Sequence, residues 1–167
     1  MSFQISGLKF AQFAGLVGLT DEQLAARNAR RVLADRHPGF PCRVSLIDAQ
    51  PGERVLLVNY EHLALPGPYR SRYAVYVREN AVDAAPAIDE IPPVLRGRLL
   101  SLRAFSAEGM LLEADVAEGP VLAPVIERLL APPAVAYLHV HNARPGCFAA
   151  RVDRASPRDA ALGPGRR

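Results

Sequence analysis

Residues 134–154, AVAYLHVHNARPGCFAARVDR, predict a β-hairpin that any fold of this chain must accommodate. The run before the turn is apolar, aromatic or histidine and carries no charge, and the run after it is short and strand-like. Pro145 and Gly146 lie between the two runs, where proline presets φ and glycine tolerates positive φ. Two strand-like runs joined by a short loop that contains glycine are typical of a hairpin.

The two faces of this predicted hairpin differ in chemistry, because side chains alternate between faces along a strand. We expect His141 to lie opposite Cys147, since this register separates the residue types cleanly and a one-residue slip mixes them. The apolar face then consists of Ala134, Ala136, Leu138, Val140, Phe148, Ala150 and Val152. The opposite face carries Tyr137, His139, His141, Cys147, Arg151 and Asp153. This polar face is where we expect a functional site.

The rest of the chain predicts an α+β fold. At 167 residues, half of them hydrophobic, the chain is long enough for one domain with a hydrophobic core. Alternating or apolar runs predict strands at residues 3–8, 31–35, 42–46, 54–60, 72–78, 99–105 and 110–116. Helical patterns predict helices at residues 10–17, 20–28 and 120–131, and the polar segment 61–71 predicts a loop that carries His62. We expect a mostly antiparallel sheet with a few short helices packed on one face, in a single domain over residues 1–155.

Composition and charge argue against several classes of protein. No apolar run approaches the roughly 20 residues of a membrane span, and two cysteines are too few for a disulfide framework, so we expect a cytoplasmic protein. Residues 151–167 hold five arginines against two aspartates, a net charge of +3 that equals the charge of the whole chain. The body is therefore neutral, which argues against nucleic-acid binding. We expect residues 156–167, rich in arginine, proline and glycine, to form a disordered tail.

Several short blocks of the sequence are distinctive. They read PCRVSL at 41–46, DA at 48–49, PGE at 51–53, LVNYEH at 57–62, PYR at 68–70, LSLRAF at 100–105, HVHNAR at 139–144 and GC at 146–147. Together they resemble the bacterial domain-of-unknown-function family numbered 1203, over roughly residues 3–154. The resemblance implies a single compact bacterial domain. It implies no activity, because the family is named for the lack of one.

Our first functional hypothesis is a binding module for a small anion, or a modest enzyme that acts on one. Arginine binds carboxylate or phosphate through two parallel hydrogen bonds, and four arginines lie in the distinctive blocks. The candidate ligand-binding residues are His139, His141, Asn142, Arg103, Arg43, Arg70 and Arg144. The alternative for these arginines is solvation or ion pairing with nearby carboxylates.

A second hypothesis is thiol or metal chemistry on the same hairpin. Cys147, expected beside His141, is a candidate nucleophile, since a neighbouring imidazole stabilises a thiolate. His139 and His141 share a strand face, and with Cys147 they form a candidate zinc site that His62 or Cys42 would complete. The apolar neighbours of Cys42 favour a buried, inert thiol instead.

A third hypothesis is a structural or interaction domain without a site, in which the histidines are hydrogen-bonded beneath a loop. The sequence has no glycine-rich phosphate loop, no Gly-x-Ser-x-Gly motif and no His-Glu-x-x-His motif. Apart from the zinc alternative we expect no cofactor. The sequence predicts neither an oligomeric state nor whether the protein is an enzyme.

Overall fold

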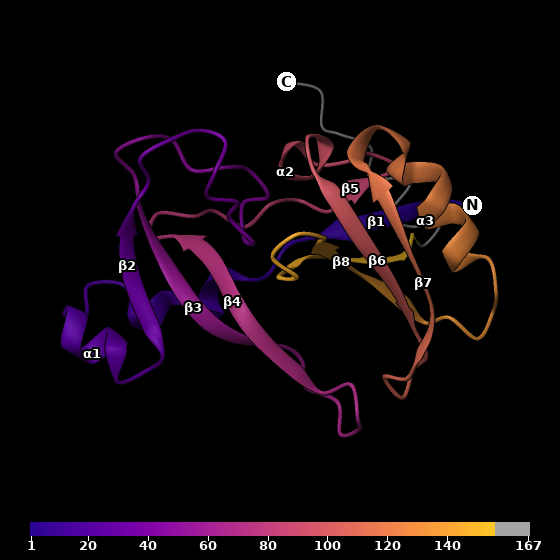
Figure 1. The fold of residues 1–167 in the computed structure, drawn as a ribbon, viewed down its shortest axis with the longest axis horizontal. Coiled ribbons are helices and arrows are strands. Elements are labelled where there is room, and N and C mark those ends of the chain that lie inside the picture. Colours follow the sequence, from indigo (N-terminus) through magenta and orange to yellow (C-terminus); the bar gives the residue numbers. More distant parts are fainter. Residues whose placement is uncertain (156–167) are drawn as a thin grey trace.

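A computed structural model describes residues 1–155 of the chain (Figure 1). The strands are β1 (Phe3–Ser6), β2 (Ala29–Leu33), β3 (Arg54–Leu63), β4 (Ser71–Arg78), β5 (Ala87–Ile88), β6 (Leu99–Phe105), β7 (Leu111–Glu118), β8 (Tyr137–Asn142) and β9 (Phe148–Arg154). The helices are α1 (Asp21–Ala25), α2 (Pro93–Arg96) and α3 (Leu122–Leu130), with 3₁₀ turns η1 (Phe10–Gln12), η2 (Ala14–Leu16) and η3 (Gly119–Val121). None of the helices within residues 1–155 is long and apolar enough to cross a membrane. The predicted tail, residues 156–167, lies outside the described residues, and the single-domain boundary stays a prediction.

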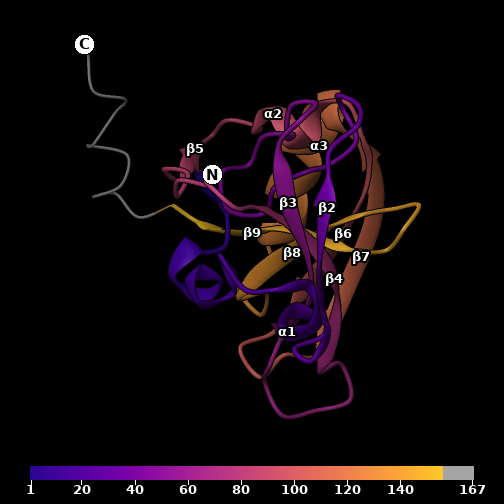
Figure 2. The ribbon, with the colours of Figure 1, turned by 90° about the vertical axis from the view of Figure 1, so that its left-hand side faces the viewer.

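Within residues 1–155 the strands form two antiparallel sheets, which lie side by side in Figure 1. The larger sheet has six strands in the order β5-β1-β9-β8-β6-β7, and the smaller has three in the order β2-β3-β4. In Figure 2 the smaller sheet stands in front of β8 and β9. The α+β class, with antiparallel sheets and few short helices, is confirmed. Alternation along the sequence predicts strands but not their partners, so it does not reveal the division into two sheets.

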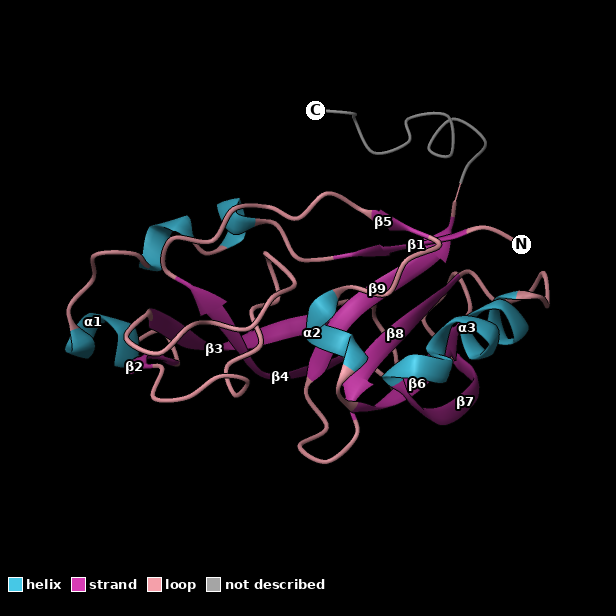
Figure 3. Cartoon of the chain, turned by 90° about the horizontal axis from the view of Figure 1, so that it is seen from above, coloured by secondary structure: helices cyan, strands magenta, loops and turns pink. Residues whose placement is uncertain are grey.

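One face of the six-stranded sheet is covered by α2 and α3 (Figure 3). Leu122, Ile126 and Leu129 form the apolar stripe of the predicted helix, and all three are fully buried. They pack in one core cluster with Leu138 and Val140 of β8. This face of β8 packs in the core. The opposite face, which carries His139 and His141, is turned toward the smaller sheet.

The β8–β9 hairpin forms, but its register differs from the predicted one. Val140 pairs with Ala150, and His141 pairs with Phe148, so Ala149 is the extra residue of a β-bulge. A bulge shifts the alternation of the strand that contains it. Phe148 therefore lies on the histidine face and not on the apolar face, where the sequence pattern wrongly placed it; its ring centroid is 5.9 Å from that of His141.

A second bulge determines where His62 lies. The predicted loop over residues 61–71 is shorter in the structure, because β3 continues to Leu63 and pairs with β4. The register of this pair shifts between Glu61 and Leu63, which makes His62 the extra residue. Bulges re-aim side chains, and here the imidazole of His62 contacts the histidine face of β8.

Two elements near the N-terminus differ from their predictions. The helix predicted over residues 10–17 consists of the two 3₁₀ turns η1 and η2, and Gly15 within η2 disfavours a continuous helix. The strand predicted over residues 42–46 is wrong, because the chain turns there and reaches a positive φ of 53° at Leu46. That turn places Arg43 between the two sheets. A capping box formed by Thr20 and Gln23 starts α1.

Candidate functional site

Arg43 is a charged side chain sealed in the interior, with 2% of its surface exposed. Its Nε donates to the carbonyl of Phe148 at 2.6 Å, its Nη1 donates to the carbonyl of Pro41, and its Nη2 donates to Sγ of Cys147 at 3.0 Å. No carboxylate of residues 1–155 forms an ion pair with it. Burial lowers the pKa of Arg43, which is the cost of holding a cation away from water.

The Sγ atom of Cys147 is the side-chain atom that accepts a hydrogen bond from the buried guanidinium of Arg43. It also accepts a hydrogen bond from Nδ2 of Asn142 at 3.4 Å. The sulfur thus lies between a buried guanidinium and an amide N–H donor. Oδ1 of Asn142 is buried and has no hydrogen-bond partner among the described residues. Buried polar atoms are normally paired, so this oxygen is free to accept from a ligand.

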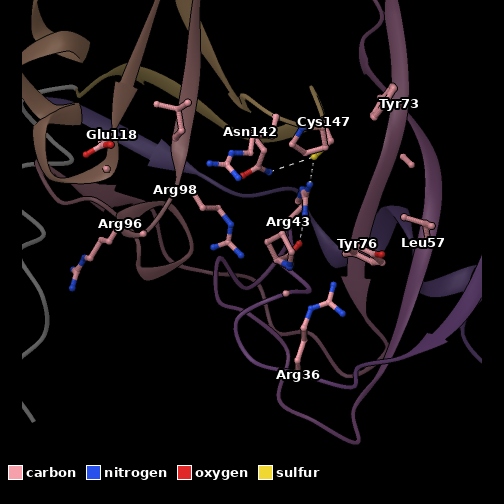
Figure 4. Close-up of a pocket in the computed structure, with 18 of the residues that line it drawn as sticks. Arg36, Arg43, Leu57, Tyr73, Tyr76, Arg96, Arg98, Glu118, Asn142 and Cys147 are labelled. Atoms are coloured by element: carbon pink, nitrogen blue, oxygen red, sulfur yellow. Dashed lines mark hydrogen bonds between the residues drawn. The ribbon is translucent and has the colours of Figure 1, made fainter.

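Cys147 and Asn142 form part of the wall of a pocket of about 1070 Å³ (Figure 4). The rest of the wall comes from the loop that contains Arg43, strands β3 and β4, the segment from the end of α2 to the start of β6, the segment from the end of β7 into η3, and the β8–β9 turn. In Figure 4 the side chains of Arg36, Arg43 and Arg98 converge on this space. The charged residues that line it are Arg36, Arg43, Arg96, Arg98, Arg144 and Glu118. Five cations against one carboxylate give the pocket a strongly positive character.

The arginines of the pocket differ in how their charge is balanced. Arg98 is paired with the buried Asp48 through two bonds of 2.6 and 2.9 Å, which fixes its side chain. Arg36 is exposed and pairs only with the exposed Asp35 at 3.2 Å, an arrangement worth little in water. Arg96 donates to a backbone carbonyl, and Arg144 makes no ion pair within the described part of the chain. The charge of Arg98 is therefore offset by Asp48, whereas that of Arg36, Arg96 and Arg144 is available to a ligand.

A second cluster lies on the histidine face of β8. His139 and His141 come from β8, and His62 comes from β3 of the other sheet. One ring nitrogen of each residue lies within 4.8 Å of a ring nitrogen of the other two. The side chains of His139 and His141 are 3% and 1% exposed, and His62 is half-buried. The histidine cluster, defined as these three residues, thus joins the two sheets.

The histidine cluster is uncharged at neutral pH. Burial is the largest cause that lowers the pKa of His139 and of His141 to about 3, and nearby imidazoles and arginines contribute to the same shift. Burial also lowers the pKa of His62, with a smaller effect from Arg103. Neutral imidazoles have a lone pair on one ring nitrogen, so the cluster presents acceptors and not cations.

The structure divides the residues that the sequence singled out. Arg43, Asn142, Arg144 and Cys147 line the arginine-rich pocket, whereas His139 and His141 belong to the histidine cluster. In that cluster His62 takes the place that the sequence gave to Cys147. The remaining candidates lie outside the pocket and the cluster. Arg103 is half-buried on β6, opposite His139. Arg70 forms an ion pair with Glu61, and Cys42 is a fully buried free thiol.

Sequence reasoning missed three of the pocket residues. Arg36, Arg96 and Arg98 come from loops and a helix end that are distant from the hairpin along the chain. Among 20 basic residues no local pattern separates them from solvated arginines. The one available signal is Asp48, an acidic residue in a distinctive block, which the structure shows to be the buried partner of Arg98.

Comparison with known proteins places the chain in a family. Residues 39–154 match the model of a family described as Protein of unknown function (DUF1203). The chain belongs to this family. The DUF1203 match contains the whole histidine cluster and every charged pocket residue except Arg36. Comparisons of this DUF1203 chain with curated proteins and with solved structures found no match, so the functional argument rests on the residues themselves.

Proposed function

We propose that this protein binds a small molecule with carboxylate or phosphate groups in the arginine-rich pocket. The observation that carries the proposal is the excess of charge: five arginines and one glutamate line a single pocket of about 1070 Å³. Pockets for small ligands typically measure a few hundred to about 1,000 Å³, so a metabolite-sized anion fits. A bound anion would offset charge that the protein leaves unbalanced.

The fixed groups of the pocket narrow the class of ligand. The guanidinium of Arg43 is sealed in the interior and uses three of its five N–H groups on protein acceptors, so the exposed Arg36, Arg96 and Arg144 are the donors left for an anion. Oδ1 of Asn142 needs a donor. The best match is therefore an anion that also carries a hydroxyl or amino group, such as a hydroxy acid or a phosphorylated sugar.

Titration calorimetry with a panel of such anions tests the proposal. We expect at least one hydroxy acid or sugar phosphate to bind, and Arg144→Gln to weaken its binding about 10-fold or more through the loss of a charge-assisted hydrogen bond. Arg27→Gln is the matched control, because Arg27 is equally exposed but lies outside the pocket. Equal losses in both variants, or no binding by any anion, would refute the proposal.

A second candidate function is thiol chemistry at Cys147, favoured by the Arg43–Cys147 contact of 3.0 Å. A thiolate that borders a positive pocket should react with iodoacetate, which is anionic, faster than with the neutral iodoacetamide. In the Cys42→Ser variant, which leaves Cys147 as the one thiol of the chain, we expect this order of rates. The reverse order, which is usual for free thiols, would exclude an activated thiol in an anion pocket.

The remaining expectations about the protein's setting are part of the same proposal. We propose a cytoplasmic protein, which the two free cysteines support, since thiols stay reduced in that compartment. We propose no nucleic-acid or membrane partner. The free arginines line a pocket of limited volume, whereas nucleic-acid binding uses a basic patch on the surface of the folded body.

A further inference from the structure

The histidine cluster contains three buried ring nitrogens that lack hydrogen bonds. They are Nδ1 of His62, Nδ1 of His139 and Nε2 of His141, and none has a partner among the described residues. Buried polar atoms are nearly always paired, and an unpaired one costs free energy. Three such atoms in one cluster, one on each imidazole, indicate that they share a partner that is not a side chain of residues 1–155.

The chemistry of that partner follows from the hydrogen bonds that the rings already make, which leave one lone pair on His141 Nε2 and allow one on His62 Nδ1. Neutral imidazoles offer lone pairs, and a lone pair is satisfied by a hydrogen-bond donor or by a metal ion. A single metal ion can satisfy all three nitrogens at once. We propose that His62, His139 and His141 bind a divalent transition-metal ion, at a site distinct from the arginine-rich pocket.

Hydrogen bonds already orient two of the three rings for this role. Nδ1 of His141 donates to the carbonyl of Gly146 at 2.9 Å, which leaves the lone pair on Nε2. Nε2 of His62 lies 3.0 Å from Oγ of Ser71, and when it donates to that hydroxyl the lone pair falls on Nδ1. Metal-bound histidines characteristically donate their second ring nitrogen to a carbonyl or another oxygen.

Aromatic rings pack around the cluster and limit how the imidazoles move. Phe148 stacks on His62 with ring centroids 5.5 Å apart, and Phe105 meets His139 edge-on at 5.3 Å. Tetrahedral zinc with Zn–N bonds of about 2.0–2.1 Å holds its nitrogens about 3.4 Å apart. One ring nitrogen of each histidine lies within 4.8 Å of a ring nitrogen of the other two, so small rotations of the rings bring three nitrogens into coordination distance.

The ligand set also selects among metals. Imidazole nitrogen suits Zn²⁺, Cu²⁺, Ni²⁺ and Co²⁺, whereas Mg²⁺ and Ca²⁺ require oxygen ligands, and no carboxylate of the described residues joins this group. Three protein ligands leave a fourth position of a tetrahedral ion to water or a small molecule. This arrangement is typical of catalytic zinc sites, while structural sites use four protein ligands.

Arg103 gives the proposed site an unusual neighbour. It lies opposite His139 in the β6–β8 pairing, is half-buried, and forms no ion pair within residues 1–155. Its charge repels a metal cation and attracts an anion. We therefore expect the fourth ligand to be anionic, and we expect Arg103→Gln to tighten the binding of Zn²⁺ itself.

Metal titration of the chelator-treated, full-length protein tests the proposal. We expect Zn²⁺ to bind with a stoichiometry of one in competition with a chromophoric chelator, and Co²⁺ to give the strong visible absorption of a tetrahedral site. Loss of a residue that only orients a ligand costs about 10- to 100-fold in affinity. We therefore expect His139→Gln and His141→Gln each to weaken Zn²⁺ binding by more than about 100-fold, and Ser71→Ala by about 10-fold.

Three control variants keep the result interpretable. His37→Gln removes an exposed histidine, and Cys147→Ser removes the thiol that borders the arginine-rich pocket; both should bind Zn²⁺ as the wild type does. Arg144→Gln should also leave Zn²⁺ binding unchanged, which separates this proposal from anion binding. Thermal unfolding identifies any variant that fails to fold. If the histidine variants do not fold, the expected weakening of Zn²⁺ binding by about 10-fold in Ser71→Ala tests the site instead. Binding that survives His139→Gln, or that falls equally with His37→Gln, would overturn the site.

Discussion

At the scale of single residues, several buried polar groups of this protein lack a hydrogen-bond or ion-pair partner among the described side chains. Among residues 1–155, Arg43 has no carboxylate partner, Oδ1 of Asn142 has no donor, and three imidazoles carry unpaired nitrogens. Each such group costs stability in the absence of a partner. We attribute these unpaired polar groups, which fall in the arginine-rich pocket and in the histidine cluster, to the ligand binding proposed above.

The buried histidines predict how stability depends on pH. The pKa values of His139 and His141 in the folded protein, about 3, lie below the value of 6.5 that applies to the unfolded chain. The unfolded chain therefore binds more protons as the pH falls below 6.5, and the stability present above 6.5 is lost progressively down to pH 3. The slope is about 1.4 kcal/mol per pH unit for each histidine.

Denaturant unfolding of the metal-free protein between pH 7 and pH 5 measures this slope, above the range in which most carboxylates titrate. His139→Gln should show a shallower slope, since one of the groups is gone. His37→Gln removes an exposed histidine and should follow the wild type. If the free energy of unfolding were constant over this range, the histidines could not be buried in their neutral form.

Arg43 predicts a large loss of stability on substitution. Arg43→Met removes the donor to two buried backbone carbonyls, and it leaves Sγ of Cys147 with only the 3.4 Å hydrogen bond from Asn142. An unpaired buried group costs about 1–3 kcal/mol, so we expect the free energy of unfolding to fall by roughly 2–4 kcal/mol. Arg30→Met, at an exposed position, should change it little. Equal effects of the two substitutions would show that Arg43 holds no such network.

At the scale of elements, the turn over residues 42–46 supports the site more than any regular strand or helix does. Its backbone links Leu8, after β1, to Tyr76 of β4 through the carbonyl and the amide of Arg43, at 2.7 and 3.0 Å. Gly7 lies directly against it. A Cβ at position 7 would lie 2.7 Å from the carbonyl oxygens of Arg43 and Val44.

Gly7→Ala should therefore displace this turn. Such contacts are too short for a real side chain, and overpacking typically costs about 1–3 kcal/mol. We expect a loss of stability of that size together with weaker anion binding, since Arg43 moves with the turn. Gly15→Ala is the control, because a Cβ there has no neighbour within 4 Å. An unchanged melting temperature in Gly7→Ala would contradict the close approach.

The helices and strands also show which parts of the fold could be predicted from the sequence. Apolar periodicity predicted α3, the central strand β3 and both faces of β8, since each depends on burial along a single segment. The two β-bulges, which reposition His62 and Phe148, leave no periodic signal because each adds one residue to a strand. The sequence pattern thus predicted His139 and His141 as neighbours but left the third histidine undecided.

At the scale of the whole molecule, both candidate sites lie where the two sheets meet. The histidine cluster takes His62 from the smaller sheet and its other two members from the larger one. The arginine-rich pocket likewise uses residues of β4 and of the β8–β9 turn. Both sites join positions more than 65 residues apart, so no local pattern in one sequence could predict them. The relative position of the sheets, and not any single motif, creates both sites.

The central claim, that the pocket beside Cys147 binds an anion, is tested most directly by using this thiol as a reporter. In Cys42→Ser, the rate of alkylation by neutral iodoacetamide is measured with increasing inorganic phosphate or hydroxy acid, at constant ionic strength maintained with chloride. We predict that the reaction slows saturably with at least one of these anions, and that Arg144→Gln shifts the protection to higher concentrations. A rate that is the same at every concentration of every anion would contradict the account.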